Sequence, residues 1–109
     1  TMTLTIEVRA KSGKANELYQ TLQALLPTLR RAKGCRNCRV SPDASNEGLH
    51  ALSCEWDSRA GFEDYIRTGS GSALIGALDL LGESVRVRLG DDAKWEGTEA
   101  LKRIRKEGG

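Results

Sequence analysis

The chain has 109 residues, a formal net charge of +2, and 39% hydrophobic against 29% charged residues. This length predicts a single domain, and the composition is typical of a soluble globular protein. The small net charge disfavours binding to nucleic acid or to an anionic membrane surface. No apolar run approaches the roughly 20 residues of a membrane helix, and no signal peptide is visible, so we expect a cytoplasmic protein.

A strand and a long helix are predicted first. Apolar and polar residues alternate over 4–8, which indicates a strand with one buried face. We expect Ser12 to cap the helix that follows, whose leucines mark one face over residues 18–29. Pro27 lies inside this pattern and should kink the helix, because it removes an amide donor and crowds the preceding turn. Gly34 should end it.

Two antiparallel strands are predicted next, over residues 35–41 and 49–56. The turn-forming residues 42–48 join them as a hairpin loop. The second strand runs directly into a helix, at whose start Asp57 and Ser58 offer side-chain oxygens to the free amides.

A further helix and a last strand complete the pattern. We expect Ser70 to cap this helix and Gly82 to end it. Its apolar face consists of Leu74, Ala77, Leu78 and Leu81. Residues 85–89 alternate as a fourth strand. The order β-α-β-β-α(α)-β predicts an α+β fold, a ferredoxin-like sandwich with an antiparallel four-stranded sheet and helices on one side.

The opposite face of the sheet is predicted to be polar. It carries Thr5, Glu7, Arg9, Arg86 and Arg88. These charges are expected to be solvated, or to pair across strands or across a dimer.

Residues 1–90 are predicted to form the domain, and residues 91–109 a basic tail. Thr98 could cap a short helix in this tail, whose apolar positions are too few to hold it in isolation. Two interpretations stay open. The tail is solvated and partly frayed, or Trp95 and Leu101 dock on a neighbouring subunit.

Three cysteines cannot all pair within one chain. Cys35 and Cys38 form a lone C-x-x-C, with only His50 and Cys54 as further soft ligands, which is too little for a zinc ribbon. We expect reduced, structural thiols. A contact between Cys35 and Cys54 is allowed in one strand register, but the apolar alternation favours the neighbouring register.

An aromatic corner is the best pocket candidate. Trp56 ends the third strand, and Phe62 and Tyr65 follow at helical spacing. The predicted substrate pocket consists of Trp56, Phe62, Ile66, Leu52, Leu74 and Leu78. Plain core packing is the competing interpretation for Trp56 and Tyr65.

Taken together, the chain resembles the antibiotic biosynthesis monooxygenase family of dimeric α/β barrel proteins. The resemblance covers roughly residues 3–89. It rests on the opening strand, on the leucine helix ending in Gly34, and above all on the run from Cys54 through Trp56 to Tyr65. It implies a homodimer in which two sheets face each other, and a small pocket between sheet and helices.

Some members of this family oxidise phenols or quinols with oxygen and without a metal or organic cofactor. The resemblance therefore implies a cofactor-free monooxygenase acting on a small hydrophobic or aromatic molecule. The alternative is a binding or sensing protein that keeps the pocket without the chemistry. Many members have a histidine about where this chain has Tyr65, and haem-degrading members use an asparagine that residues 4–10 lack, so we do not expect haem degradation.

Cofactor-free oxidation needs a base, a donor for the oxyanion and a dry aromatic cavity. His50, the only histidine, is the candidate base, and Tyr65 is the candidate donor. Both are also compatible with simple packing. No metal site is expected. An RNA-binding sheet would need exposed aromatic residues on its face, which the predicted strands do not supply.

Overall fold

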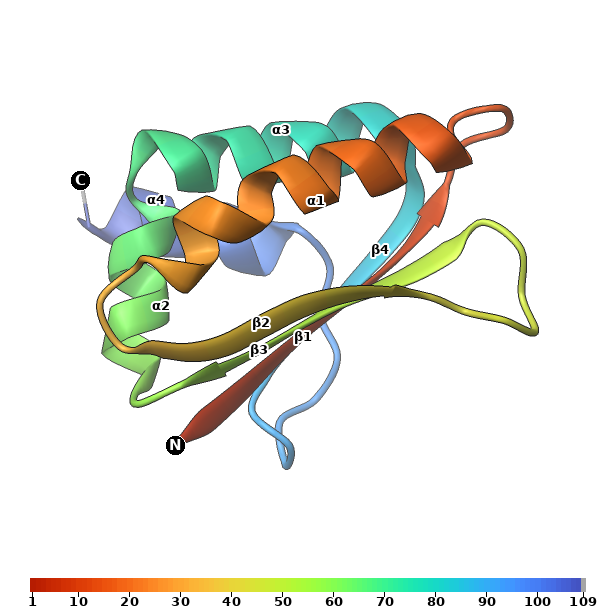
Figure 1. Cartoon of the computed structure of the whole chain (residues 1–109). Helices are drawn as coiled ribbons and strands as arrows, with labels where there is room; N and C mark the ends of the chain where they lie inside the picture. The colour runs from red at the N-terminus through yellow and green to blue at the C-terminus, as the bar shows by residue number, and fades with distance from the viewer. Residues whose placement is uncertain (109) are drawn as a thin grey trace.

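The computed structural model describes residues 1–108. The elements in chain order are β1 (Met2–Ala10), α1 (Ala15–Arg30), β2 (Cys35–Pro42), β3 (Leu49–Trp56), α2 (Arg59–Ile66), α3 (Gly69–Leu81), β4 (Gly82–Leu89) and α4 (Glu99–Gly108). The strands form one antiparallel sheet in the order β2-β3-β1-β4, and the helices lie on one side of it (Figure 1). The predicted ferredoxin-like α+β fold is confirmed, as an open sheet that is not closed into a barrel within one chain.

The central strand β1 supplies the middle of the core. Leu4, Ile6 and Val8 are fully buried beneath the helices, as their alternation predicts. Leu4 faces Cys54 of β3 on one side and Leu89 of β4 on the other. Because side chains on a strand alternate between faces, this register also places Thr5, Glu7, Arg86 and Arg88 on the open side.

Helix α1 follows its leucine stripe, but its ends differ from the prediction. The helix continues past Pro27 to Arg30. Lys14, not Ser12, occupies the N-cap position, and no side chain caps the helix there. Gly34 has a φ of 90° in the turn into β2, a conformation that favours glycine.

The joint between α2 and α3 depends on Thr68. Its Oγ1 accepts a hydrogen bond from the amide of Gly71 at 3.2 Å, so Thr68 caps α3 and the prediction of Ser70 as the cap is wrong. A Cβ atom on Gly71 would lie 2.4 Å from the carbonyl oxygen of Ile66. Only glycine fits between the two helices here. This close approach fixes the angle at which α2 meets α3.

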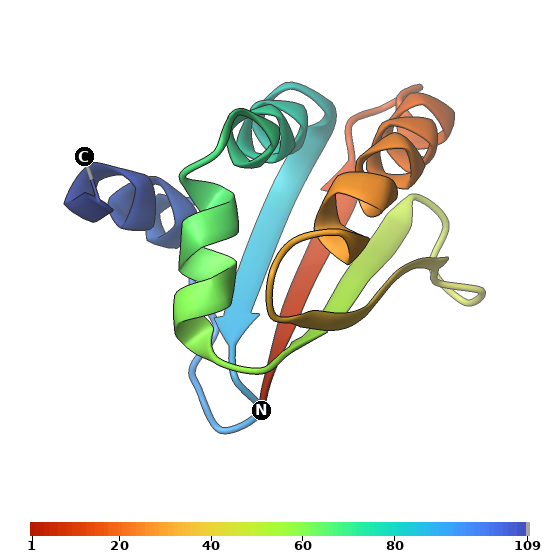
Figure 2. The same cartoon turned by 60° about the vertical axis from the view of Figure 1, so that its left-hand side comes forward.

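The C-terminal helix α4 packs against its own chain, beside α2 (Figure 2). Leu101 is fully buried, so the expectations of a frayed tail and of docking by Leu101 on another subunit are corrected. Two arginines cap the two helices reciprocally. Arg67 donates to the carbonyl of Ile104 at 3.1 Å, and Arg105 donates to that of Ile66 at 2.6 Å. These bonds satisfy carbonyl groups that a helix end leaves free.

The segment between β4 and α4 covers the outer edge of the sheet. Glu96 forms two backbone hydrogen bonds with Val87, of 2.7 and 2.8 Å. Trp95 thereby stacks on the guanidinium groups of Arg86 and Arg88, 4.1 and 4.7 Å from its ring centre. The predicted cross-strand pairing of Arg86 with Glu7 is present at 2.6 Å.

The expectation of three reduced cysteines is wrong. Cys38 and Cys54 face each other across β2 and β3 and form a disulfide. In this register Cys38, and not Cys35, lies opposite Cys54. A bulge between Cys35 and Asn37 leaves the half-buried Cys35 as the free thiol.

None of the helices in residues 1–108 combines the length and apolarity needed to span a bilayer.

Candidate functional site

A cavity of about 620 Å³ lies where the end of α1, the junction of β3 with α2, and the start of α3 meet. We call it the Tyr65 cavity. Its wall is formed by Thr28, Arg31, Ala32, Lys33, Gly34, Asp57, Ser58, Ala60, Gly61, Asp64, Tyr65, Thr68 and Ser70. The cavity follows from the connectivity, because two helix starts and one helix end converge there and none of them can fill the corner with long apolar side chains.

Tyr65 is the buried wall of this cavity, with only 4% of its surface exposed. Its hydroxyl lies 2.9 Å from Thr28 Oγ1, which in turn donates to the carbonyl oxygen of Leu25 at 2.6 Å. Since a threonine hydroxyl has one hydrogen and a carbonyl can only accept, Tyr65 must be the donor to Thr28. The Tyr65 hydroxyl therefore donates in this bond, and no group within residues 1–108 donates a hydrogen bond to it.

Burial also keeps the Tyr65 phenol neutral. Desolvation raises its pKa above the usual value, and the hydrogen bond with Thr28 opposes that rise in part. Because the neutral Tyr65 hydroxyl already donates its hydrogen to Thr28, it is suited to accept a hydrogen bond from the hydroxyl group of a ligand. This differs from the sequence prediction, in which Tyr65 donates to an oxyanion.

Trp56 lies directly behind the cavity wall. It is fully buried, with its ring centre 5.5 Å from that of Phe62 and 6.2 Å from that of Tyr65. A Cβ atom on Gly61 would lie 3.4 Å from the edge of the Trp56 ring and 3.0 Å from the carbonyl oxygen of Lys33. The glycine thus lets the turn after α1 approach α2 closely and brings the indole next to the cavity.

Two carboxylates lie on the rim of the cavity, and each has a guanidinium partner. Asp57 pairs with Arg36, and Asp64 lies 3.6 Å from Arg67. The side chain of Asp64 is 81% exposed, so water screens this second pair strongly. Both carboxylates are groups that can exchange a proton with a molecule in the cavity.

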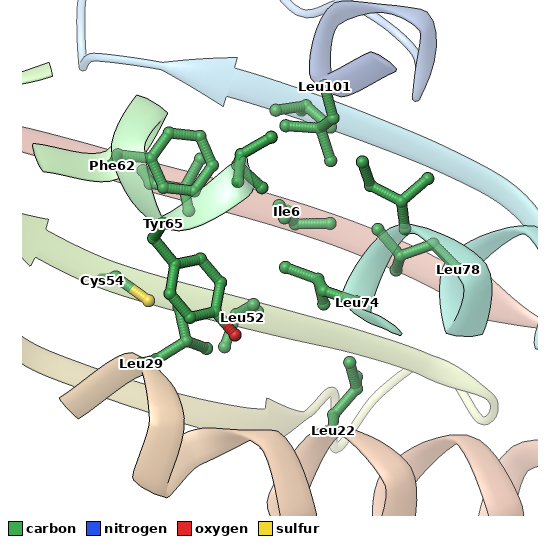
Figure 3. Close-up of a cluster of buried hydrophobic side chains, with 14 of the residues drawn as sticks. Ile6, Leu22, Leu29, Leu52, Cys54, Phe62, Tyr65, Leu74, Leu78 and Leu101 are labelled. Atoms are coloured by element: carbon green, nitrogen blue, oxygen red, sulfur yellow. The ribbon is translucent and has the colours of Figure 1, made fainter. Parts of the chain in front are cut away.

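The predicted apolar pocket residues are core residues in this structure. Leu52, Trp56, Phe62, Ile66, Leu74 and Leu78 are all at most 1% exposed. They belong to one buried cluster together with the leucines of α1, and Figure 3 shows Leu52, Phe62, Leu74 and Leu78 within it. Of the eight residues predicted for the site, Tyr65 is the one that lines the Tyr65 cavity.

His50 lies at the other end of β3. It is six residues from Trp56, which corresponds to about 20 Å along a strand. It is 5% exposed, its Nδ1 donates to the carbonyl of Gly48 at 3.3 Å, and its ring centre is 5.8 Å from that of Tyr19. A separate cavity of about 340 Å³ borders it. The structure does not bring His50 together with Tyr65.

Sequence reasoning missed Thr28 and the charged rim. Thr28 lies one turn from the end of a leucine helix, where nothing in the pattern separates it from other half-buried polar residues. The sequence predicts that Asp57 and Ser58 cap α2, but the carboxylate of Asp57 pairs with Arg36 instead, and Ser58 at the N-cap position makes no side-chain cap bond. Within residues 1–108, no group of three or more His, Cys, Asp or Glu side chains is arranged to hold a metal ion.

The arrangement can hold a small planar molecule by chemistry that the residues supply. An apolar ring would contact Ala32 and Ala60, with Trp56 behind Gly61, while a hydroxyl group donates to Tyr65. A carboxylate on the rim then lies on the same cavity wall as that hydroxyl. This is the minimum needed to bind a phenol and to accept its proton.

Comparison with known proteins agrees with this fold. A family model described as antibiotic biosynthesis monooxygenase matches residues 1–70. No curated protein is significantly similar in sequence. A crystal structure of a protein from Pseudomonas aeruginosa has a TM-score of 0.74 and 23% identity, covering 81% of this chain and 89% of that one.

Two further structures support the same assignment. A protein from Shewanella oneidensis has a TM-score of 0.75 and 18% identity, over 87% of this chain and 89% of that one. A structure described as an antibiotic biosynthesis monooxygenase has a TM-score of 0.75 and 16% identity, over 86% of this chain and all of the other. At such identities the structures establish the fold, and the family model covers more than half of the chain. The chain belongs to the antibiotic biosynthesis monooxygenase family.

Proposed function

We propose that the protein is a cofactor-independent monooxygenase that oxidises a small phenol or quinol in the Tyr65 cavity. The observation that carries this proposal is the hydrogen-bond chain from Tyr65 through Thr28 to the Leu25 carbonyl. It orients the hydroxyl of Tyr65, a residue that lines a cavity whose rim also carries two carboxylates.

The chemistry uses the electrons of the substrate itself. A substrate hydroxyl is first oriented by donating to Tyr65; it then gives up this hydrogen bond and transfers its proton to Asp57 or Asp64, which leaves an electron-rich phenolate. The phenolate reduces oxygen at a ring carbon. One oxygen atom enters the substrate and the other leaves as water, while the substrate loses two hydrogens, so that SH₂ and O₂ give SO and H₂O. Tyr65, with Trp56 and Phe62 packed behind it, closes the cavity on its core side and limits access of water there.

Oxygen uptake tests this proposal. We expect a panel of 1,4-naphthohydroquinone, methylhydroquinone and anthrone to include a substrate whose oxygen consumption exceeds the rate without protein. Tyr65→Phe should lower that excess by about fivefold or more, since one oriented hydrogen bond is worth roughly 1 kcal/mol or more.

Tyr19→Phe is the matched control. Tyr19 is the other tyrosine of the chain, and its hydroxyl accepts from Gln23 at 2.8 Å, away from the Tyr65 cavity. This variant should keep full activity. Equal activity in both variants would remove Tyr65 from the mechanism, and no uptake above background with any of the three compounds would argue against the monooxygenase.

A second candidate function is small-molecule binding without turnover. Both rim carboxylates are ion-paired and solvated, and the buried His50 lies at the far end of β3, which leaves the cavity without a buried base. Binding of the same compounds, measured by calorimetry, with no oxygen uptake would select this function.

We also propose that two copies associate through the open face of the sheet. Small side chains occupy the middle of this face, at Thr5, Ala51 and Ser53, and would allow two sheets to approach. Light scattering should give twice the mass of 11.9 kDa. Ser53→Arg should shift it toward one copy, whereas Gln20→Arg on the exposed side of α1 should not; an unchanged mass in Ser53→Arg would count against this interface.

A further inference from the structure

The rim of the Tyr65 cavity carries two cations without anionic partners. Arg31 and Lys33 are exposed at the end of α1 and in the turn after it, and both line the cavity. Among residues 1–108, neither has a carboxylate within 4.0 Å.

The two carboxylates on the same rim do not cancel these cations. Asp57 pairs with Arg36 and Asp64 with Arg67, and neither of these two arginines belongs to the cavity wall. Counting both pairs as neutral, the rim has an excess of two positive charges. The exposed start of α2, where Ser58 makes no cap bond, adds free backbone amides of the same sign to this rim.

The cavity therefore offers different chemical groups at its buried end and at its exposed mouth. Tyr65 forms its buried end and offers a hydrogen-bond acceptor, whereas Arg31 and Lys33 stand at its exposed mouth. Alanine and glycine residues, Ala32, Ala60 and Gly61, lie on the wall beside them. A ligand that matches this order has a hydroxyl at one end, a flat apolar body, and an anionic group at the other end.

We infer that the ligand of the Tyr65 cavity is a hydroxylated aromatic acid, whose carboxylate is held by Arg31 and Lys33 and whose hydroxyl donates to Tyr65. This rests on the proposed function of the cavity and names the class of molecule that it takes. The acid group is remote from the reacting ring carbon. It contributes binding and orientation, and takes no part in proton or electron transfer.

Calorimetric titration with three matched probes tests the charge at the mouth. 4-Hydroxybenzoate, 4-hydroxybenzamide and 4-hydroxybenzylamine have nearly the same size and carry a negative, a neutral and a positive group. We expect the acid to bind about tenfold more tightly than the amide, the ratio that one charge-assisted hydrogen bond supports, and the amine to bind most weakly. The ratio should fall as salt is raised from 20 to about 500 mM.

The double variant Arg31→Gln with Lys33→Gln should lose most of the preference for the acid and keep its affinity for the amide. Lys94→Gln removes an exposed cation that does not line the cavity, and serves as the control with an unchanged ratio. Backbone amide shifts of Gly61 and Tyr65 on titration with 4-hydroxybenzoate would place the probe.

Any of four results would overturn the inference. These are equal affinity for the acid and the amide, tighter binding of the amine, a preference for the acid that survives in the double variant, or no binding of any probe. Binding needs no turnover, so the two proposals fail separately. If the acid binds as expected and oxygen is not consumed, the monooxygenase proposal fails and the ligand class stands. If a neutral quinol is oxidised and the acids do not bind, the monooxygenase proposal stands and the inferred ligand class fails.

Discussion

The two ends of β3 each bury a ring on the helix side of the sheet, with opposite results. At one end Trp56 packs edge-on against Phe62, and the chain turns at once into α2 beside the Tyr65 cavity. At the other end His50 contacts Tyr19 and its own loop carbonyl, next to a smaller cavity. A titratable side chain in the core does not by itself mark a site. What differs is that three helix ends converge at the Trp56 end, and their backbone groups cannot be covered by apolar side chains.

Removing a buried ring at each end of β3 should lower the stability of the protein by different amounts. Trp56→Ala is expected to lower the free energy of unfolding by about 3–5 kcal/mol, because a fully buried ring leaves a large cavity. Tyr19→Ala, which removes a half-buried ring at the His50 end, should cost about 1–2 kcal/mol. Urea denaturation measures both. Similar losses in the two variants would mean that the Trp56 end is not the better packed one.

The disulfide lies two residues from Trp56 on β3 and should stabilise that end. Reduction of Cys38 and Cys54 is expected to cost about 3 kcal/mol, the value for a closed loop of roughly this length. Mass spectrometry after alkylation should count one thiol before reduction and three after. Burial raises the pKa of the remaining thiol, Cys35, so its alkylation should be slow at neutral pH. Three reactive thiols without reductant would contradict the disulfide.

The Tyr65→Phe variant should change how the stability of the Trp56 end depends on pH. Near neutral pH the loss of the bond to Thr28 should cost about 1 kcal/mol. Burial raises the folded-state pKa of Tyr65 above its unfolded value of 10.0, so its contribution is complete below pH 10 and is lost as the pH rises through the folded pKa. Unfolding measured from pH 8 to 11.5 should show a smaller alkaline loss in Tyr65→Phe than in the native chain. Parallel curves would show that Tyr65 is not desolvated.

His50→Gln should have the smallest effect on function. His50 lies about 20 Å along the strand from Trp56, so ligand binding in the Tyr65 cavity and oxygen uptake should both stay at the native level. Titration with the probes described above, together with the oxygen electrode, checks this. A large loss of uptake with intact folding would move the site to the His50 end.

The fold could be predicted from the sequence because its period-2 and period-3.6 patterns are strong. The alternation over residues 4–8 and the leucines of α1 each specify one buried face. The capping residues of α1 and α3 could not be predicted. Ser12 and Ser70 have the right chemistry, but Thr68 is favoured because Gly71 must fit against α2.

The site was predicted less well than the fold. An apolar side chain on a helix face looks the same in sequence whether it lines a cavity or fills the core, and Leu74 and Leu78 fill the core. The true cavity wall is made mainly of helix ends and turns, where Thr28 and Gly61 have no periodic signal. The sequence predicts Tyr65 because it follows Trp56 and Phe62 at helical spacing and carries a hydroxyl group, whereas its role as an acceptor depends on the position of Thr28.

The pairing of Glu96 with Val87 has a consequence for how this protein behaves when crowded with its own copies. β4 is an outer strand with apolar residues at Val85, Val87 and Leu89, and a bare strand of this kind is a template for adding strands of other molecules. The segment after Gly90 occupies that template at its middle and places Trp95 across the neighbouring arginines. A chain ending at Gly90 would therefore expose the unpaired edge of β4 and tend to form fibrillar aggregates. The segment after Gly90 thus protects the protein from aggregation, in addition to packing against α2.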